Sequence, residues 1–142
     1  MAHRRIARQL VLEALYRFDL VKDSPEKTLE EILKRKRYIE EVREYSKRLL
    51  RDTITHLKEI DKEIENNLLS WRFKRLSFLD RALLRLATCE LLYYKDIPYK
   101  VSINEAVEIA RFYGTEGSAK FVNAVLDTIL KSRGKNACRD IL

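Results

Sequence analysis

Glycine, proline and cysteine are scarce in this sequence. It has three glycines, two prolines and two cysteines among its 142 residues. A β-sandwich or barrel needs glycine and proline for its many tight turns, so their scarcity favours helices. The two cysteines, Cys89 and Cys138, are too few for a disulfide framework, which excludes the small disulfide-stabilised class of secreted domain.

Signatures of catalysis, metal binding and membrane insertion are also missing. His3 and His56 lie far apart in the sequence, with no cysteine or carboxylate at ligand spacing, so we expect no metal site. The sequence has no glycine-rich phosphate loop and no nucleophile elbow. No apolar run approaches the roughly 18 residues that span a bilayer, and no signal-peptide pattern opens the chain. We therefore expect a soluble cytoplasmic protein with no catalytic residue, metal or cofactor.

Apolar residues and positive charge are abundant. Apolar residues make up 46% of the chain, and 29 lysines and arginines against 22 acidic residues give a net charge of +7. A chain of this length can bury a substantial core as one domain or as two small packed subdomains. The excess positive charge indicates a polyanionic partner, although charge alone does not separate a nucleic acid from a membrane surface.

The spacing of the apolar residues predicts an all-α protein. Ser77 with Asp80, and Ser102 with Glu105, resemble capping boxes at the start of two helices. Gly114 is expected to end a helix in a left-handed conformation, and Thr115 can cap the last helix. The expected helices cover residues 3–19, 25–36, 38–69 (as one helix or two), 77–94, 102–113 and 115–134, with a connection at 70–75.

The helix predicted over residues 77–94 is apolar nearly all round, which is typical of the buried centre of a bundle. Its polar residues Arg81, Arg85 and Thr88 follow steps of four and three residues and therefore form one stripe. We expect that stripe to reach either solvent or a ligand.

The first predicted helix begins with a cluster of positive charge. Arg4, Arg5 and Arg8 lie at the end of the helix that its dipole already makes positive, so they disfavour the helix. The same arrangement would bind a phosphate well, because guanidinium groups and free N–H groups then face one anion. The alternative is a frayed, solvated terminus.

Two apolar residues of the same helix are predicted to face away from the core. At about 100° per residue, Leu12 and Tyr16 fall on the side of Arg5. They would contact either a protein partner or another part of this chain. The predicted core stripe consists of Ile6, Ala7, Leu10, Val11, Ala14 and Phe18.

A second basic segment precedes the last helix, where Lys120 and Phe121 follow the run Thr115-Glu-Gly-Ser118. Backbone N–H groups, a lysine and an aromatic face can together bind a splayed base and its phosphate. In the alternative, Phe121 packs in the core, Lys120 lies in solvent and Gly117 only permits close packing.

An ordered set of motifs extends over almost the whole chain. The set comprises Arg4-Arg5 through Ala14-Leu15-Tyr16, Ile60-Asp61, Trp71, Asp80-Arg81, Leu84-Arg85, Glu90-Leu91, Asp96-Ile97-Pro98, Ile103-Asn104-Glu105-Ala106, Lys120-Phe121-Val122-Asn123 and Leu126-Asp127. Together these motifs resemble the NusB family of bacterial transcription antitermination factors.

That resemblance implies a single all-helical domain of two packed three-helix subdomains, at about residues 1–69 and 70–142. It also implies a heterodimer with NusE, a small-subunit ribosomal protein, that binds boxA RNA in nascent transcripts, especially ribosomal ones. The complex then helps RNA polymerase to pass terminators, without catalysis by this chain.

The resemblance assigns roles to individual residues. The RNA-binding residues that it implies are Arg4, Arg5, Arg8, Glu116, Gly117, Lys120 and Phe121. The residues facing NusE are Tyr16, Asp80 and Arg81, and Leu12 is added by extrapolation along the helix. Gly117 stands where the family often has Asp or Asn, which leaves only backbone contact to RNA at that position, and Ala124 replaces a frequent glycine.

Two alternatives remain at this point. Some ribosomal RNA methyltransferases carry a NusB-like module, but the dozen residues after Leu130 are too few for a cofactor-binding domain. The other alternative is a homodimer that uses Leu12 and Tyr16.

Overall fold

The computed structural model describes residues 2–68 and 73–133, and these residues form seven α-helices and one 3-10 turn. The all-α prediction is confirmed, and the described ranges contain no strand. The elements are α1 (Ala2–Val21), α2 (Pro25–Leu33), α3 (Glu40–Thr55), α4 (Leu57–Asn66), η1 (Phe73–Arg75), α5 (Phe78–Tyr93), α6 (Tyr99–Tyr113) and α7 (Glu116–Ser132). Trp71, Cys138 and Gly134, the expected end of the last helix, lie outside the described residues.

Side-chain caps start two helices where the sequence predicts them. The Ser77 hydroxyl accepts a hydrogen bond from the backbone N–H of Asp80 at 3.0 Å, at the start of α5. The Thr115 hydroxyl accepts one from the N–H of Ser118 at 3.0 Å, at the start of α7. Each cap satisfies an N–H group that has no partner within the helix. The pattern over 38–69 resolves into two helices, which meet at His56.

The other two predicted helix signals are wrong in detail. Ser102 does not cap α6, because the helix already begins at Tyr99 after Pro98 and buries Ser102 one turn inside it. Proline fixes φ near the helical value and so can begin a helix before any polar cap. Gly114 ends α6 as predicted, but its φ of −116° is not left-handed. The Glu105 side chain is therefore not used in a capping box and can bind another group.

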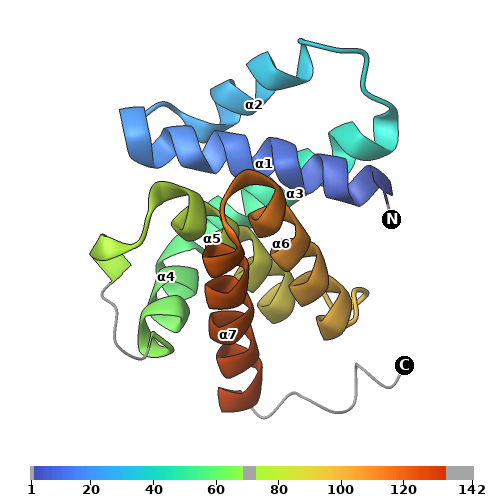
Figure 1. Cartoon of the computed structure of the whole chain (residues 1–142). Helices are drawn as coiled ribbons and strands as arrows, with labels where there is room; N and C mark the ends of the chain where they lie inside the picture. The colour runs from blue at the N-terminus through green and yellow to red at the C-terminus, as the bar shows by residue number, and fades with distance from the viewer. Residues whose placement is uncertain (1, 69–72, 134–142) are drawn as a thin grey trace.

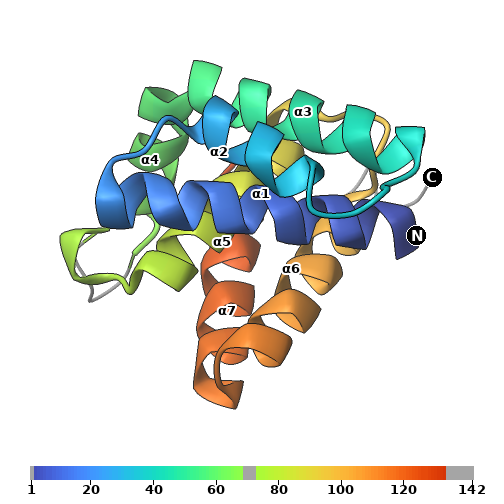
Figure 2. The same cartoon turned by 90° about the horizontal axis from the view of Figure 1, so that it is seen from above.

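Helix α1 lies between two groups of helices (Figures 1 and 2). It packs against α2 and α3 on one side and against α5 on the other, and α5 also contacts α3, α4, α6 and α7. Helices α6 and α7 pack along each other, while α4 contacts α5 and α7. The division into two subdomains stays a prediction.

The position of α1 explains why one predicted surface residue is buried. Leu12 is only 3% exposed, whereas Ile6, predicted for the core, is 37% exposed. A helix covered on two sides buries apolar residues on more than one face, so a single core stripe is the wrong description of α1. Tyr16 is exposed as predicted, at 36%. Leu12 is therefore not accessible to NusE or to a second copy of this chain, contrary to the prediction.

Replacing Gly114 by alanine should lower the free energy of unfolding by about 1–3 kcal/mol, because an added Cβ overpacks the α6–α7 turn. It would lie 3.1 Å from the Ala110 carbonyl oxygen and 3.2 Å from Ser118 Cβ. At Gly117 an added Cβ meets only the Thr115 hydroxyl, at 3.5 Å. Urea denaturation should therefore show G117A within about 0.5 kcal/mol of the parent protein. Equal stability of the two variants would contradict this steric account.

Candidate RNA and partner interface

Arg5 is held in place by two hydrogen bonds at the start of α1. Its Nε and Nη2 atoms each donate to a carboxylate oxygen of Glu105 on α6, both at 2.8 Å. This bidentate geometry fixes the guanidinium plane. The hydrogen bond from Arg5 lowers the pKa of the Glu105 carboxyl below its usual range. Nearly half of the Arg5 side chain stays exposed, so an external anion can still reach it.

Arg4 is also accessible. Its Nη2 atom lies 3.6 Å from Asp96 Oδ2, and its guanidinium stands over the Tyr45 ring at 4.7 Å. It borders a surface hollow of about 520 Å³ with His3 and Arg48. The acidic residues beside Arg4 and Arg5 come from later parts of the chain. Tertiary ion pairs therefore offset the charge cluster that the isolated helix would disfavour.

Arg8 is not available to a phosphate, contrary to the prediction, because its side chain is only 2% exposed. Its Nε donates to Glu90 Oε2 at 2.8 Å, and the Tyr45 hydroxyl donates to the same oxygen at 2.5 Å. Its Nη1 atom lies 3.6 Å from Glu105 Oε1. A buried arginine needs such a partner, and α5 supplies it in Glu90. Arg8 thus supports the carboxylate that holds Arg5.

A network of charges connects α1 to the α6–α7 turn. Arg111 Nη1 donates to Glu108 Oε2 at 2.6 Å, and Arg111 Nε donates to Glu116 Oε1 at 3.1 Å. Glu108 and Arg111 line the same surface hollow as Arg5. We call Arg5, Glu105, Glu108, Arg111 and Glu116 the charged row. It connects the basic start of α1 with the start of α7, which are separate segments in the sequence.

Lys120 and Gly117 continue this surface onto α7, and both are exposed. The Arg111 hydrogen bond is the main reason why the pKa of the Glu116 carboxyl is lowered, and Lys120 adds to the effect. Both predicted basic segments thus lie on one continuous surface, one at each end of the charged row.

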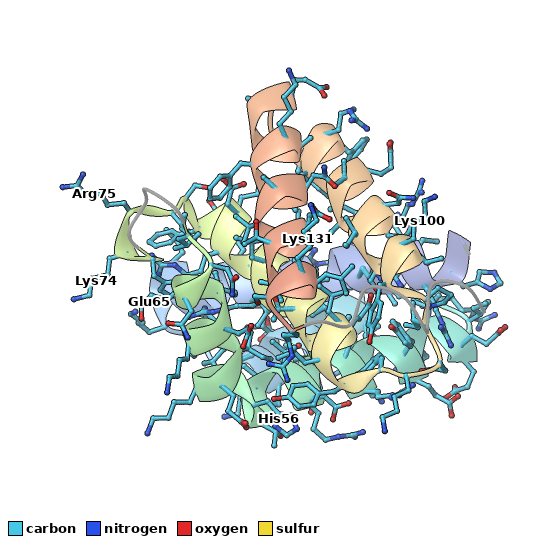
Figure 3. All side chains as sticks on the ribbon, turned by 90° about the horizontal axis from the view of Figure 1, so that it is seen from below. His56, Glu65, Lys74, Arg75, Lys100 and Lys131 are labelled. Atoms are coloured by element: carbon cyan, nitrogen blue, oxygen red, sulfur yellow. The ribbon has the colours of Figure 1, made fainter. Side chains whose placement is uncertain are left out.

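Phe121 combines features of its two predicted roles. It is half-buried and packs against the core, yet it borders a surface hollow of about 560 Å³ with Leu76, Gly117 and Arg75. Figure 3 shows the Lys74 and Arg75 side chains extending away from the body of the protein. Part of the ring can therefore meet a ligand, and positive charge lies nearby.

The predicted partner-facing residues have different environments. Tyr16 is exposed and meets the Phe78 ring edge-on, with 6.4 Å between the centroids. Asp80 accepts a hydrogen bond from the Ser118 hydroxyl and so ties α5 to α7. Arg81 is mostly buried, lies 3.7 Å from Asp19 and donates to the Phe73 carbonyl at 3.3 Å. Tyr16 and its neighbour Phe78 are therefore the accessible part of this surface.

The predicted polar stripe on α5 faces the interior, not solvent or a ligand. Arg85 is buried and donates from Nε to Asp61 at 2.8 Å and from Nη1 to Asp19 at 3.0 Å. Thr88 is fully buried. The two aspartates come from α1 and α4, so spacing on α5 alone could not reveal them.

Arg111 and the aromatic pair that follows it are not among the site residues predicted from the sequence. The Phe112 and Tyr113 rings meet edge-on with centroids 4.9 Å apart, and both side chains are exposed. An arginine followed by two aromatics at the end of a helix is a signal that could have identified them.

Within the described ranges, no helix is long and apolar enough to cross a membrane. The same ranges contain no group of three or more His, Cys, Asp or Glu residues that could hold a metal ion.

The sequence model of the NusB family matches residues 5–131 of this chain. The chain belongs to the NusB family. It is similar to transcription antitermination protein NusB of Nitratiruptor sp., with 42% identity over 92% of this chain and 94% of that protein. The structure of T. maritima NusB is 46% identical, with a TM-score of 0.84 and 90% of each chain covered.

Another structure similar to this NusB family member contains the antitermination factors NusB and NusE in complex with double-stranded RNA. The matching chain is 32% identical, with a TM-score of 0.84, and the match covers 93% of this chain and 98% of that one. The match to the NusB family model includes the whole charged row and Lys120.

Proposed function

We propose that this chain is a transcription antitermination factor that binds boxA RNA of nascent ribosomal transcripts as a heterodimer with NusE. The complex would help RNA polymerase to pass terminators, and it would act in the cytoplasm by binding, without catalysis. The family match, the relatives named as antitermination proteins and the similar structure with NusE and RNA support this proposal.

The observation that carries the RNA-binding part is the continuous surface from Arg4 and Arg5 to Lys120. The exposed guanidinium and ammonium groups at its ends would attract phosphates and release counterions, so binding would weaken as salt rises. Contacts to bases near Phe121 and Glu116 would add preference for particular RNA sequences. Gly117 would contribute only through its backbone.

Arg8 would act indirectly in this proposal. It pairs with Glu90 and lies beside Glu105, whose carboxylate accepts both hydrogen bonds from Arg5. The buried pair would therefore orient the Arg5 guanidinium before RNA arrives. Preorganisation of this kind lowers the entropy cost of binding.

The partner-binding part is supported by the exposed aromatic edge of α1 and α5. Tyr16 and Phe78 offer rigid apolar area of the kind that is enriched at protein interfaces. Asp80 lies two residues after Phe78 on α5 and can add charge complementarity, while Arg81 would hold the local backbone of η1 through its hydrogen bond to the Phe73 carbonyl. Leu12 is not part of this proposed surface.

Light scattering of the chain with and without NusE tests the heterodimer. We expect an equimolar mixture to give the mass of one copy of each protein, and Tyr16→Ala to weaken that complex by about tenfold. Ile39→Ala, at an exposed apolar residue directly before α3, serves as the control. A mass that does not change when NusE is added would contradict the proposal. A concentration-dependent doubling without NusE that is lost in Y16A would favour the homodimer.

The methyltransferase alternative receives no support from the relatives. The match to the Nitratiruptor protein covers 94% of that protein's own length, and the match to the Pseudothermotoga lettingae protein, 43% identical, also covers 94%. These relatives are therefore about as long as this chain.

A further inference from the structure

Phe112 is unusually exposed for its size. Its side chain is 74% exposed, the highest value among the large apolar residues that the structure describes. The adjacent Tyr113 ring meets it edge-on at 4.9 Å between centroids, which restrains its orientation. The core does not require a phenyl ring at this position, because Ile109 and Ala110 already bury the inner face of α6.

The surroundings of Phe112 are suited to a nucleotide. It lines a surface hollow of about 430 Å³ with Arg5 and Gln9 from α1 and with Glu108 and Arg111 from α6. The hollow is continuous with the charged row, since three of these residues belong to it. The Gln9 amide can both donate and accept hydrogen bonds at a base edge.

The charge balance distinguishes this position from the two basic ends of the surface. Arg5 pairs with Glu105, and Arg111 pairs with both Glu108 and Glu116. Three carboxylates thus offset two guanidinium groups, which is a poor environment for a dense run of phosphates. An uncharged aromatic base is a better fit there, because stacking on a phenyl ring depends little on local charge.

We propose that Phe112 is a stacking platform for one unpaired RNA base, placed between the phosphate contacts at Arg5 and those at Lys120. This inference rests on the proposed RNA-binding function and adds a base contact to it. Gln9 would hydrogen-bond the edge of the stacked base, and the paired guanidinium groups of Arg5 and Arg111 would flank it. The ring would bind the base in any sequence, and Gln9 would supply the preference.

The test uses boxA RNA in which 2-aminopurine replaces one base at a time along the strand. With the wild-type chain and NusE present, one position should lose fluorescence on binding through stacking. Phe112→Ala should abolish that loss and weaken binding by about tenfold. Phe112→Trp should preserve both effects, whereas Phe112→Leu, which is apolar but not aromatic, should behave as F112A. Val101→Ala, an exposed apolar residue at the other end of α6, is the matched control.

Each other outcome has a distinct meaning. If F112A and V101A both retain wild-type fluorescence and affinity, the stacking inference is wrong while the proposed function stands. If F112A instead weakens binding to NusE without RNA, Phe112 is a protein contact and the inference is again overturned. If the wild-type chain with NusE binds boxA and scrambled RNA equally, both the proposed function and this inference fail.

Discussion

Replacing Glu90 by alanine is expected to remove about 3–5 kcal/mol from the free energy of unfolding. The substitution leaves the Arg8 guanidinium buried without its carboxylate partner and the Tyr45 hydroxyl without its acceptor. Glu105 Oε1 lies 3.6 Å from Arg8 Nη1, but Glu105 accepts its hydrogen bonds from Arg5 and makes none to Arg8, so it compensates for little of this loss. A loss of this size is a large fraction of the stability of an ordinary domain. Urea denaturation at neutral pH measures it.

Two further variants separate the buried charge from other causes. Glu65→Ala removes a carboxylate that points outward from α4 (Figure 3) and should change the stability by no more than about 0.5 kcal/mol. The double variant R8M/E90M replaces both charges by apolar side chains and should be more stable than E90A, because no unpaired ion remains. If E90A unfolds at the same urea concentration as E65A, the Arg8–Glu90 pair is not structurally important.

The double variant R4A/R5A is expected to bind RNA about a hundredfold more weakly at low salt, since each arginine would lose a charge-assisted contact to phosphate. The slope of log K against log salt concentration should become shallower by about 1.4, because two fewer phosphates are neutralised on a single strand. Phosphate contacts carry no sequence information, so boxA and scrambled RNA should lose affinity by similar factors. Anisotropy titrations at several salt concentrations measure all three quantities.

A matched control removes the same charge elsewhere. Lys58 and Lys62 are exposed on α4, which lies on the opposite side of the protein from the N-terminus in both views (Figures 1 and 2). K58A/K62A should therefore retain most of the affinity and nearly the whole salt slope. If the two double variants lose affinity equally, net charge explains RNA binding and the site at the start of α1 is wrong.

Local signals in the sequence predicted the helices well. Apolar spacing located each of them, and the caps at Ser77 and Thr115 form as expected because each needs only residues within one turn. The Ser102 and Gly114 predictions used equally local signals and were less accurate. At Ser102 the proline four residues earlier already begins the helix, and at Gly114 close packing between α6 and α7 requires glycine without a left-handed backbone.

Contacts between distant residues could not be predicted in the same way. Arg8 is buried because Glu90 lies against it, 82 residues later in the sequence. Leu12 is buried because α1 is covered from two sides, which a helical wheel of one helix cannot show. The candidate site has the same limitation, since the Arg5 and Lys120 segments were both identified, but the charged row that links them depends on how α1, α6 and α7 pack.

The most direct test of the proposed function is a titration of labelled boxA RNA with this chain, followed by fluorescence anisotropy, with and without purified NusE. A scrambled RNA of the same length and composition is the control. The account predicts that NusE tightens binding to boxA RNA and adds little to the scrambled RNA. Equal, weak and salt-sensitive binding to both RNAs, unchanged by NusE, would contradict it and would mean that this member of the NusB family has another partner or target.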